Sequence, residues 1–258
     1  MKNIFFLIIS GSLLFSPIDV FGEDRDLMKL NLTGDCAGCN LKEVDLSGAN
    51  LSEANLTGTD LSGANLQNAN LSYANLLDAN LDGAKFSFTN FFRGNLAGAD
   101  LSGADLTRTN LSGANLTGAD LSWAKLNGAN LNGANLSSAN LRGANLAGAN
   151  LSGAKLNGAN LYYANLSNIK LDNRNLTNKN TPNLVGANLS GADLSGLNFF
   201  GADLSNVNLV GADLSRANLY GANLTGADLE KSILKKIKIE NILFCNTKLP
   251  WGIDNSGC

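Results

Sequence analysis

A single apolar position recurs along most of the chain with a period of five residues. Leu or Phe stands at every fifth position from Leu41 through Leu176, with Phe86 and Phe91 as the two aromatic members of that series. A small residue, usually Ala, comes two positions earlier, and Asn or Asp comes immediately before, as in Ala114-Asn115-Leu116-Thr117-Gly118. Self-similarity at a fixed short period predicts a repeat architecture.

A five-residue period fits neither of the common secondary structures. In an α-helix each Leu would be turned by about 140° from the previous one, so the series would share no face. In a straight strand successive Leu residues would point to opposite faces of the sheet, because five is odd. The series is buried if the chain bends after every pentapeptide and its coils stack at the spacing of paired strands, about 4.8 Å. The period alone leaves open whether three or four pentapeptides form one coil.

The five-residue spacing is interrupted once, near residue 180. Leu176 and Leu184 are eight positions apart, after which steps of five resume and continue to Leu249. Just upstream, Ile169 and Arg174 stand where the small residue is expected, and burying an unpaired Arg would be costly. We therefore expect a protruding loop at about 172–183, with the register shift itself at 177–183. The loop is either a partner-binding element or a tolerated insertion.

The first 22 residues are typical of a secretory signal peptide. Lys2 precedes an apolar run over residues 4–15, and Val20-Phe21-Gly22 offers a cleavage site. A membrane anchor is the alternative, but about a dozen residues rising 1.5 Å each span roughly 18 Å, short of the ~30 Å hydrocarbon core. We expect the remaining chain to be exported, periplasmic or secreted, or to reach a thylakoid lumen if the source is photosynthetic. No membrane span is expected after signal cleavage.

The tandem A-(N/D)-L-x-x units resemble the pentapeptide repeat family over roughly residues 36–250. The resemblance implies an all-β fold, a right-handed quadrilateral parallel β-helix with four pentapeptides per coil and about ten coils. It places Leu41 and its successors at the central inward position, and Ala49, Ala54 and Ala64 at the second inward position. The expected organisation is signal peptide 1–22, N-terminal cap 23–40, repeat segments 41–176 and 184–248, separated by the register-shift loop 177–183, and C-terminal cap 249–258.

Four cysteines stand at the two ends of this expected rod: Cys36, Cys39, Cys245 and Cys258. The first two form a C-x-x-C pair, but a redox role expects a strand-helix context that is absent. A zinc site would need all four thiolates together. About ten coils would hold the two ends roughly 50 Å apart, whereas bridged Cα atoms lie within about 7 Å of each other. In an oxidising compartment we therefore expect Cys36 to pair with Cys39, and Cys245 with Cys258, as end caps.

Composition excludes most enzyme chemistry. The chain contains no His, and its Lys and acidic residues are dispersed, so spacing assembles no activated serine nucleophile. Gly148 and Gly153 have phosphate-loop spacing, but Ala154 stands where the lysine must be. We expect a protein that is not an enzyme and has no cofactor or metal.

The segment 230–248 departs from the rest of the repeats. It holds five Lys against two Glu, whereas residues 23–229 hold 18 acidic and 13 basic side chains. It also replaces the small residues by bulkier apolar ones: Ile233, Leu234, Ile237, Ile239, Ile242, Leu243 and Phe244. These side chains are expected to form a wider last coil that seals the core. The alternative, which the family resemblance brings, is a homodimer through the C-terminal coil.

The leading functional hypothesis is a non-enzymatic exported rod, acting as a structural or protein-interaction scaffold with an unknown protein partner. Tyr162 and Tyr163 are adjacent aromatic residues at predicted outward positions near the loop. Together with Arg174 and Lys179 of the loop region, they are the candidate partner contacts. The family resemblance also suggests a DNA-mimicking modulator of a topoisomerase such as gyrase. A signal peptide would separate the protein from cytosolic gyrase, and a net charge of -3 is small for a polyanion mimic. Nucleic-acid binding is not expected.

Overall fold

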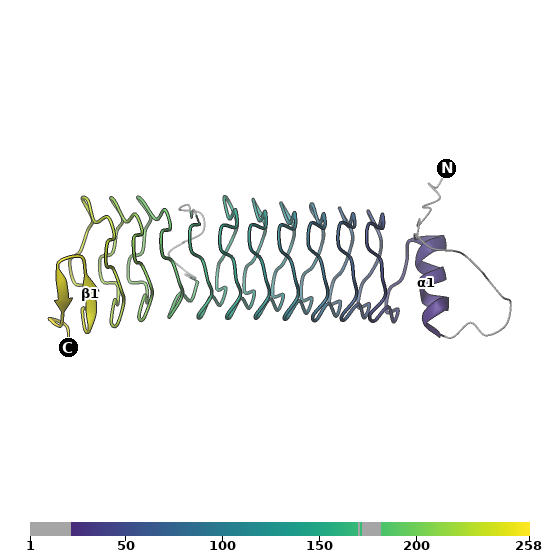
Figure 1. Ribbon diagram of the computed structural model, residues 1–258, viewed down its shortest axis with the longest axis horizontal. Helices are drawn as coiled ribbons and strands as arrows, with labels where there is room; N and C mark the ends of the chain where they lie inside the picture. Colours follow the sequence, from purple (N-terminus) through teal and green to yellow (C-terminus); the bar gives the residue numbers. More distant parts are fainter. Residues whose placement is uncertain (1–21, 170, 172–181) are drawn as a thin grey trace.

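The chain forms a rod of stacked coils with a different cap at each end (Figure 1). The computed structural model describes residues 22–169, 171 and 182–258. Helix α1, Gly22–Thr33, lies at the N-terminal end, and strands β1, Thr247–Leu249, and β2, Gly252–Asp254, form an antiparallel hairpin at the C-terminal end. The coils between these caps are built from turns and single parallel bridges.

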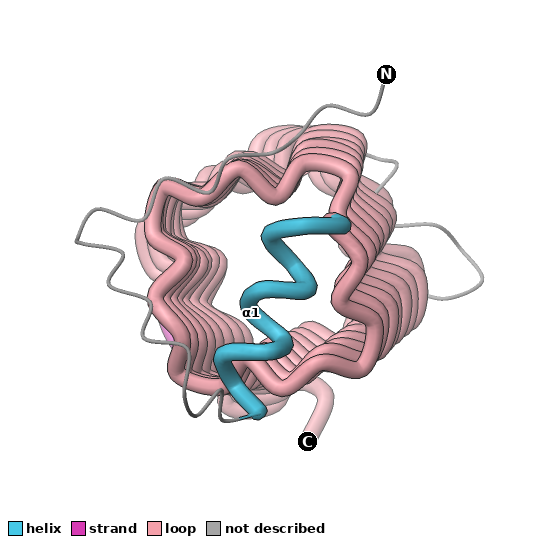
Figure 2. Tube along the Cα trace, turned by 90° about the vertical axis from the view of Figure 1, so that its right-hand side faces the viewer, coloured by secondary structure: helices cyan, strands magenta, loops and turns pink. Residues whose placement is uncertain are grey.

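Apart from one longer coil near residue 180, the bridges repeat every 20 residues, so a coil consists of four pentapeptides. Parallel bridges join equivalent residues of successive coils from Asp35↔Asn55 through Asn145↔Asn165. Within this ladder the Leu116 N–H donates to the Asn135 carbonyl at 2.8 Å, and the Asn135 N–H donates to the Ala114 carbonyl at 2.9 Å. Viewed along the rod, the coils superimpose as a four-sided figure (Figure 2). The quadrilateral cross-section expected from the resemblance is thus the one that the backbone pairing produces.

The five-residue series fills the interior of the rod. The described members from Leu41 to Leu171 and from Leu184 to Leu229 are all buried, and the Phe86 and Phe91 rings meet edge to face with centroids 5.1 Å apart. Ala fills most of the second inward positions, because a narrow coil has no room there for another large side chain. In the described part of the chain Thr occupies four such positions, and each buried hydroxyl donates to a backbone carbonyl one coil earlier at 2.6–2.7 Å: Thr59 to Cys36, Thr89 to Leu66, Thr109 to Phe86 and Thr247 to Leu224. The hydroxyls are therefore buried without losing their hydrogen bonds.

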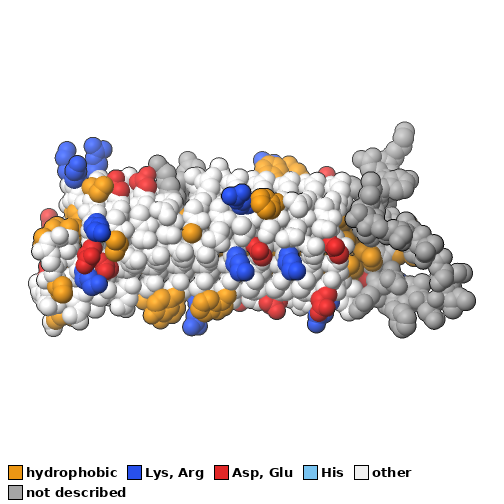
Figure 3. All heavy atoms as spheres, in the orientation of Figure 1, with side chains coloured by type: hydrophobic (Ala, Val, Ile, Leu, Met, Phe, Trp, Pro, Cys, Tyr) orange, Lys and Arg blue, Asp and Glu red, His pale blue; other side chains and the backbone are white. Residues whose placement is uncertain are grey.

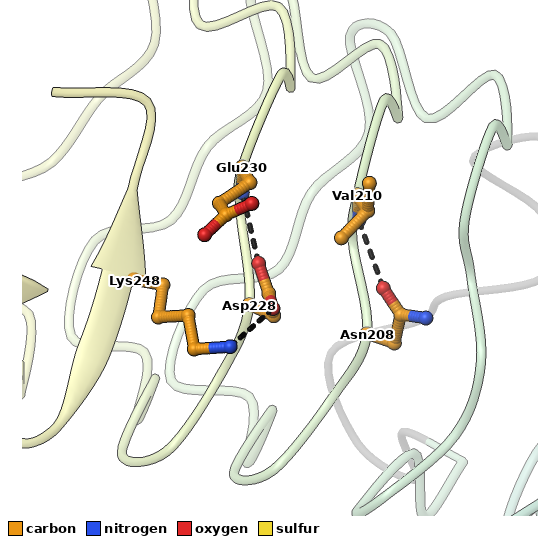
Figure 4. Close-up of polar contacts among 5 residues, drawn as sticks. All are labelled: Asn208, Val210, Asp228, Glu230 and Lys248. Carbon is orange, nitrogen blue, oxygen red and sulfur yellow. Dashed lines mark hydrogen bonds and ion pairs between the residues drawn. The ribbon is translucent and has the colours of Figure 1, made fainter. Parts of the chain in front are cut away.

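Asn residues stack into ladders along the outside of the coils. Asn90 donates from Nδ2 to the Oδ1 of Asn70 at 3.1 Å, and Asn110 donates in the same way to Asn90 at 2.8 Å. The same Oδ1 atoms also accept the backbone N–H two residues later, which fixes the turn. Figure 4 shows this second contact near the C-terminal end, where Asn208 accepts from Val210 at 3.0 Å and Asp228 accepts from Glu230 at 3.1 Å.

The register of the bridges shifts once, after the Asn145↔Asn165 pair. Asn160 pairs with Asn183 and Asn165 pairs with Asn188, and the original spacing returns at Asn188↔Asn208. The three additional residues in this coil are those inferred from the gap between Leu176 and Leu184. Most of the predicted loop lies outside the described residues, although Asn183, its last member, already belongs to the ladder.

Helix α1 is an element that the repeat pattern did not predict. It lies across the first coil at the N-terminal end of the rod (Figure 2), where Leu30 is buried and Leu27 packs against the core. The Asp26 carboxylate accepts the Asn40 N–H at 2.8 Å, so the helix also binds the backbone of the first coil. The helix covers apolar side chains that have no preceding coil, which is the role of a terminal cap in a solenoid.

The cysteines are paired as expected. The Sγ atoms of Cys36 and Cys39 are 2.10 Å apart, and those of Cys245 and Cys258 are 2.11 Å apart. The first pair is buried at the base of α1, whereas Cys258 of the second pair is exposed. Each pair therefore lies at one end of the rod and closes the chain locally.

Leu234, Ile237, Ile242 and Phe244 of the last coil pack against the core, but this coil is itself only partly covered. Ile239 occupies an inward position of the repeat, yet 47% of its surface is exposed, and Leu234 and Phe244 are only half-buried. The cause is that no further coil stacks on them, and the short hairpin β1–β2 covers only part of the end. The described part of the chain contains no helix that is long and apolar enough to cross a membrane.

Candidate protein interaction surface

Four side chains from three successive coils lie along one corner of the rod. Arg142 and Tyr162 occupy equivalent positions in successive coils, and Trp123 occupies the position equivalent to Gly143, the neighbour of Arg142. The backbone ladder fixes this alignment, because the Trp123 N–H donates to the Arg142 carbonyl at 2.9 Å and the Gly143 N–H donates to the Tyr162 carbonyl at 3.0 Å. We call Trp123, Arg142, Tyr162 and Tyr163 the aromatic corner.

Each of the two exposed rings lies over a glycine of the next coil. A Cβ atom added at Gly143 would be only 2.5 Å from Cε3 and Cζ3 of Trp123, and one added at Gly186 would be 2.7 Å from Cε1 of Tyr163. The rings therefore occupy the space that a larger corner residue would fill. Trp123 still exposes 64% of its surface and Tyr163 exposes 58%. Both rings are held against the rod while much of each remains open to a partner.

Arg142 and the two tyrosines contact one another closely. The Tyr162 and Tyr163 ring centroids are 4.3 Å apart, and the Arg142 guanidinium carbon is 5.6 Å from the Tyr162 centroid, within cation–π range. The pKa of the Tyr162 hydroxyl is raised, chiefly by hydrogen bonding with the Tyr163 side chain, while Arg142 acts in the opposite direction. The corner combines aromatic area, hydroxyl groups and one positive charge.

Smaller aromatic contacts lie on the other corners. Arg93 is placed over the Phe92 ring at 5.2 Å, and Arg108 over the Phe88 ring at 5.8 Å. Tyr220 stacks on Phe200 with centroids 5.5 Å apart. None of these residues aligns with positions 123, 143 and 163 when the 20-residue coils are superimposed, so these groups lie on corners other than the aromatic corner.

The structure brings together two of the four predicted partner contacts. Tyr163 is exposed, as predicted, and the adjacent Tyr162 is half-buried between its neighbours. Arg174 and Lys179 lie outside the described residues. Arg142 and Trp123 were not predicted as partner contacts from the sequence. They can be found once the length of one coil is known, because a 20-residue coil aligns positions 123, 143 and 163.

Among residues 22–169, 171 and 182–258 no group of three or more Cys, Asp or Glu side chains is arranged to hold a metal ion. The carboxylates with a lowered pKa accept hydrogen bonds from the backbone N–H groups of the turns that follow them. Burial raises the pKa of Asp105, but hydrogen bonds from the Thr107 side chain and backbone outweigh that effect and lower it.

The fold defines a β-solenoid built from five-residue units, and comparison with known proteins identifies its family. The pentapeptide repeat family matches the chain in 8 copies, over residues 35–67, 59–94, 95–133, 134–173, 183–199 and 198–235. The chain belongs to this family. A search of curated proteins finds no match.

Solved structures similar to this chain include other members of the family. HetL, involved in heterocyst differentiation regulation in the cyanobacterium Nostoc sp. strain PCC 7120, is 35% identical, with 84% of this chain and 90% of HetL covered and a TM-score of 0.34. QnrB1, a plasmid-mediated fluoroquinolone resistance protein, is 18% identical, with coverages of 79% and 92% and a TM-score of 0.36. A protein of the Arabidopsis thaliana thylakoid lumen is 27% identical, with coverages of 55% and 70% and a TM-score of 0.13.

Proposed function

We propose that this protein is a non-enzymatic, exported scaffold that binds a protein partner through the aromatic corner. The observation that carries the proposal is the exposed Trp123 ring, held over Gly143 next to Arg142 and the tyrosine pair. Trp, Tyr and Arg are the residues that most often dominate the binding energy of protein interfaces. Membership of a family whose members are generally structural or interaction scaffolds supports the same conclusion.

The backbone conformation of the aromatic corner is the one found at other corners of the rod. Trp123 has a φ of 60° and Tyr163 a φ of 55°, in the left-handed region that favours glycine. Gly103 and Gly143, at the same corner in the coils before and after Trp123, adopt φ values of 63° and 66°. A bulky residue costs about 1–2 kcal/mol in this conformation. Other non-Gly corner residues, such as Glu43 and Phe88, adopt the same conformation, so this cost is common to the corners of the rod and is not specific to Trp123.

Export rests on the predicted signal peptide at 1–22, which ends where α1 begins. The two cysteine pairs at bonding distance are consistent with an oxidising compartment. Determining the N-terminal residue of the protein isolated from the exported fraction of its source tests this part of the proposal. A protein recovered only in the cytosol, with an intact N-terminus, would contradict it.

The test of the aromatic corner compares two exposed aromatic residues on different corners. Trp123→Gly removes the ring and installs the residue of the neighbouring coils. Phe88→Gly is the matched control, because Phe88 is also exposed and has a φ of 62°. Chemical cross-linking in the source organism should capture a partner with the parent protein and with Phe88→Gly, but not with Trp123→Gly. Equal capture by all three proteins would rule out the corner as the binding site.

The alternative function, a DNA mimic that binds a topoisomerase such as gyrase, is less well supported by the distribution of charge on the surface of the rod. A DNA mimic needs dense negative charge along the rod. One ladder instead mixes both signs, with Asp45, Asn65, Lys85, Asp105 and Lys125 in successive coils, and Figure 3 shows acidic and basic side chains interspersed along the visible face. We expect no effect of micromolar protein on gyrase supercoiling, and inhibition or protection in that assay would favour the mimic.

A further inference from the structure

The C-terminal end of the rod exposes large apolar side chains that no other described element covers. Ile239 belongs to the inward series but is exposed here because the rod ends, and Ile233 and Leu243 of the same coil are also exposed. In the hairpin, Trp251 lies between β1 and β2 and exposes 71% of its surface, and Ile253 of β2 exposes 68%. We call Ile233, Ile239, Leu243, Trp251 and Ile253 the apolar tip.

Basic side chains lie in the same last coil as the apolar tip. Lys231, Lys235, Lys236 and Lys238 all belong to the last coil and are exposed. Arg216 stacks one coil earlier, and with Lys235, Lys236, Ser195 and Ser215 it lines a shallow groove. Figure 3 shows the hydrophobic and basic groups gathered at this end of the rod.

The charge of this end is available to a partner. Lys248 is engaged within the protein, since its Nζ atom is 3.0 Å from Oδ2 of Asp228 (Figure 4). In the described part of the chain the other four lysines of the last coil form no ion pair with an acidic residue. Residues 230–258 also contain the acidic Glu230, Glu240 and Asp254, so the four lysines leave a small positive excess at this end, whereas residues 23–229 are acidic.

We propose that this end docks on the surface of an anionic lipid bilayer. Lys side chains are attracted to lipid phosphates near a negatively charged membrane, and their apolar stems can lie along the interface while the ammonium groups remain in water. Trp is enriched at the level of the headgroups, where its ring is apolar and its N–H is polar. Exposed Ile and Leu side chains gain by entering the boundary between headgroups and acyl chains.

A second copy of this chain fits the same surface less well. Two ends placed face to face would bring two clusters of lysines together, and like charges at an interface oppose association. An anionic bilayer presents the opposite charge and an apolar interior at the same time. The charge pattern therefore favours lipid over self-association, and the rod would stand away from the membrane with the aromatic corner free for its protein partner.

The experiment uses the full exported chain with its disulfides intact, because its two tryptophans can be read separately. A Trp123→Phe variant reports on Trp251 at the tip, and a Trp251→Phe variant reports on Trp123 in the middle of the rod. Each is mixed with vesicles of phosphatidylcholine alone or with an equal share of phosphatidylglycerol. We expect the emission of Trp251 to shift to shorter wavelength only with phosphatidylglycerol, and the emission of Trp123 to stay unchanged.

The charge dependence provides the second measurement. Lys235→Gln, Lys236→Gln and Lys238→Gln together should lower the affinity for phosphatidylglycerol vesicles by about fivefold per residue, without changing the circular dichroism of the rod. No shift of Trp251 with phosphatidylglycerol vesicles, or an equal shift with both vesicle types, would overturn the proposal. So would a Trp251 shift that depends on protein concentration in the absence of vesicles, because that result identifies a second copy as the occupant.

Discussion

The indole of Trp123 occupies the space that a side chain at Gly143 would need. A Cβ at that position would lie 2.5 Å from two ring atoms of Trp123, and Gly143 itself has a φ of 66°. The same relation recurs where Tyr163 lies over Gly186. At these two positions the corner residue of one coil is coupled to that of the next coil, and glycine there accommodates the large side chain.

This coupling predicts unequal effects of the same substitution at two glycines. Gly133→Ala should destabilise the rod by about 1–2 kcal/mol, because Gly133 has a φ of 68° but nothing within 4 Å of the added methyl group. Gly143→Ala should cost more, since Trp123 must also move. Urea unfolding of both variants measures the difference. Combining Gly143→Ala with Trp123→Gly should reduce its cost to that of Gly133→Ala, and an unchanged cost would contradict the steric explanation.

Interrupting an Asn ladder should destabilise the rod more than removing an exposed Asn side chain. In Asn110→Ala the Oδ1 of Asn90 loses the Asn110 Nδ2 donor, and the Ser112 N–H, the Ser112 hydroxyl and the Asn130 Nδ2 lose their acceptor. Hydrogen bonds of this kind contribute about 0.5–1.5 kcal/mol each, so the loss of all four should cost at least about 2 kcal/mol. Asn132→Ala, in which an exposed side chain is removed from the turn, is the control and should change stability by less than about 0.5 kcal/mol. Thermal unfolding followed by circular dichroism compares the two variants, and equal transition temperatures would show that the ladder contributes little.

Acid should weaken the rod through carboxylates that accept hydrogen bonds in the turns. Burial raises the pKa values of Asp105 and Asp120, but hydrogen bonds from Thr107 and Ser122 outweigh that effect and keep both pKa values below the ordinary value. A carboxyl group with a lowered folded-state pKa stabilises the protein above its unfolded pKa, near 3.9, and this contribution is lost as the pH falls through the folded-state pKa.

The free energy of unfolding should accordingly fall as the pH is lowered below about 4. An Asp105→Asn, Asp120→Asn double variant should show a shallower fall over the same range, because two of the contributing groups no longer titrate. Urea unfolding at a series of pH values provides the measurement. Parallel pH profiles for the parent protein and the double variant would show that these carboxylates are not responsible.

The two disulfides should differ in their response to reducing agent. Cys36 and Cys39 are buried beneath α1, whereas Cys258 is exposed, so the Cys245–Cys258 bond should be reduced first. This bond closes a segment with a sequence separation of 13, and its loss should destabilise the C-terminal end by about 3 kcal/mol in the chain-entropy estimate. Timed alkylation with mass spectrometry gives the order of reduction. Hydrogen exchange should then rise in the last coil and hairpin but not at Cys36, and the reverse order would contradict this account.

The repeat could be predicted from the amino-acid sequence alone, because a Leu at every fifth position cannot be buried by a helix or a straight strand. The same pattern also predicted the three-residue register shift between Leu176 and Leu184. The pairing of Cys36 with Cys39 and of Cys245 with Cys258 was also predictable, because two ends separated by the length of the rod cannot be bridged.

Only the tertiary structure decided which outward residues become neighbours. Trp123, Arg142 and Tyr163 are far apart in the sequence, and they meet because the length of one coil brings every twentieth position to the same corner. The structure also decided how the rod ends. Helix α1 covers the first coil, although its sequence lacks the repeat, whereas Ile239 has the inward position of the repeat and remains exposed because no coil follows it. Burial in a solenoid depends on the neighbouring coil, and a local pattern cannot report whether that neighbour exists.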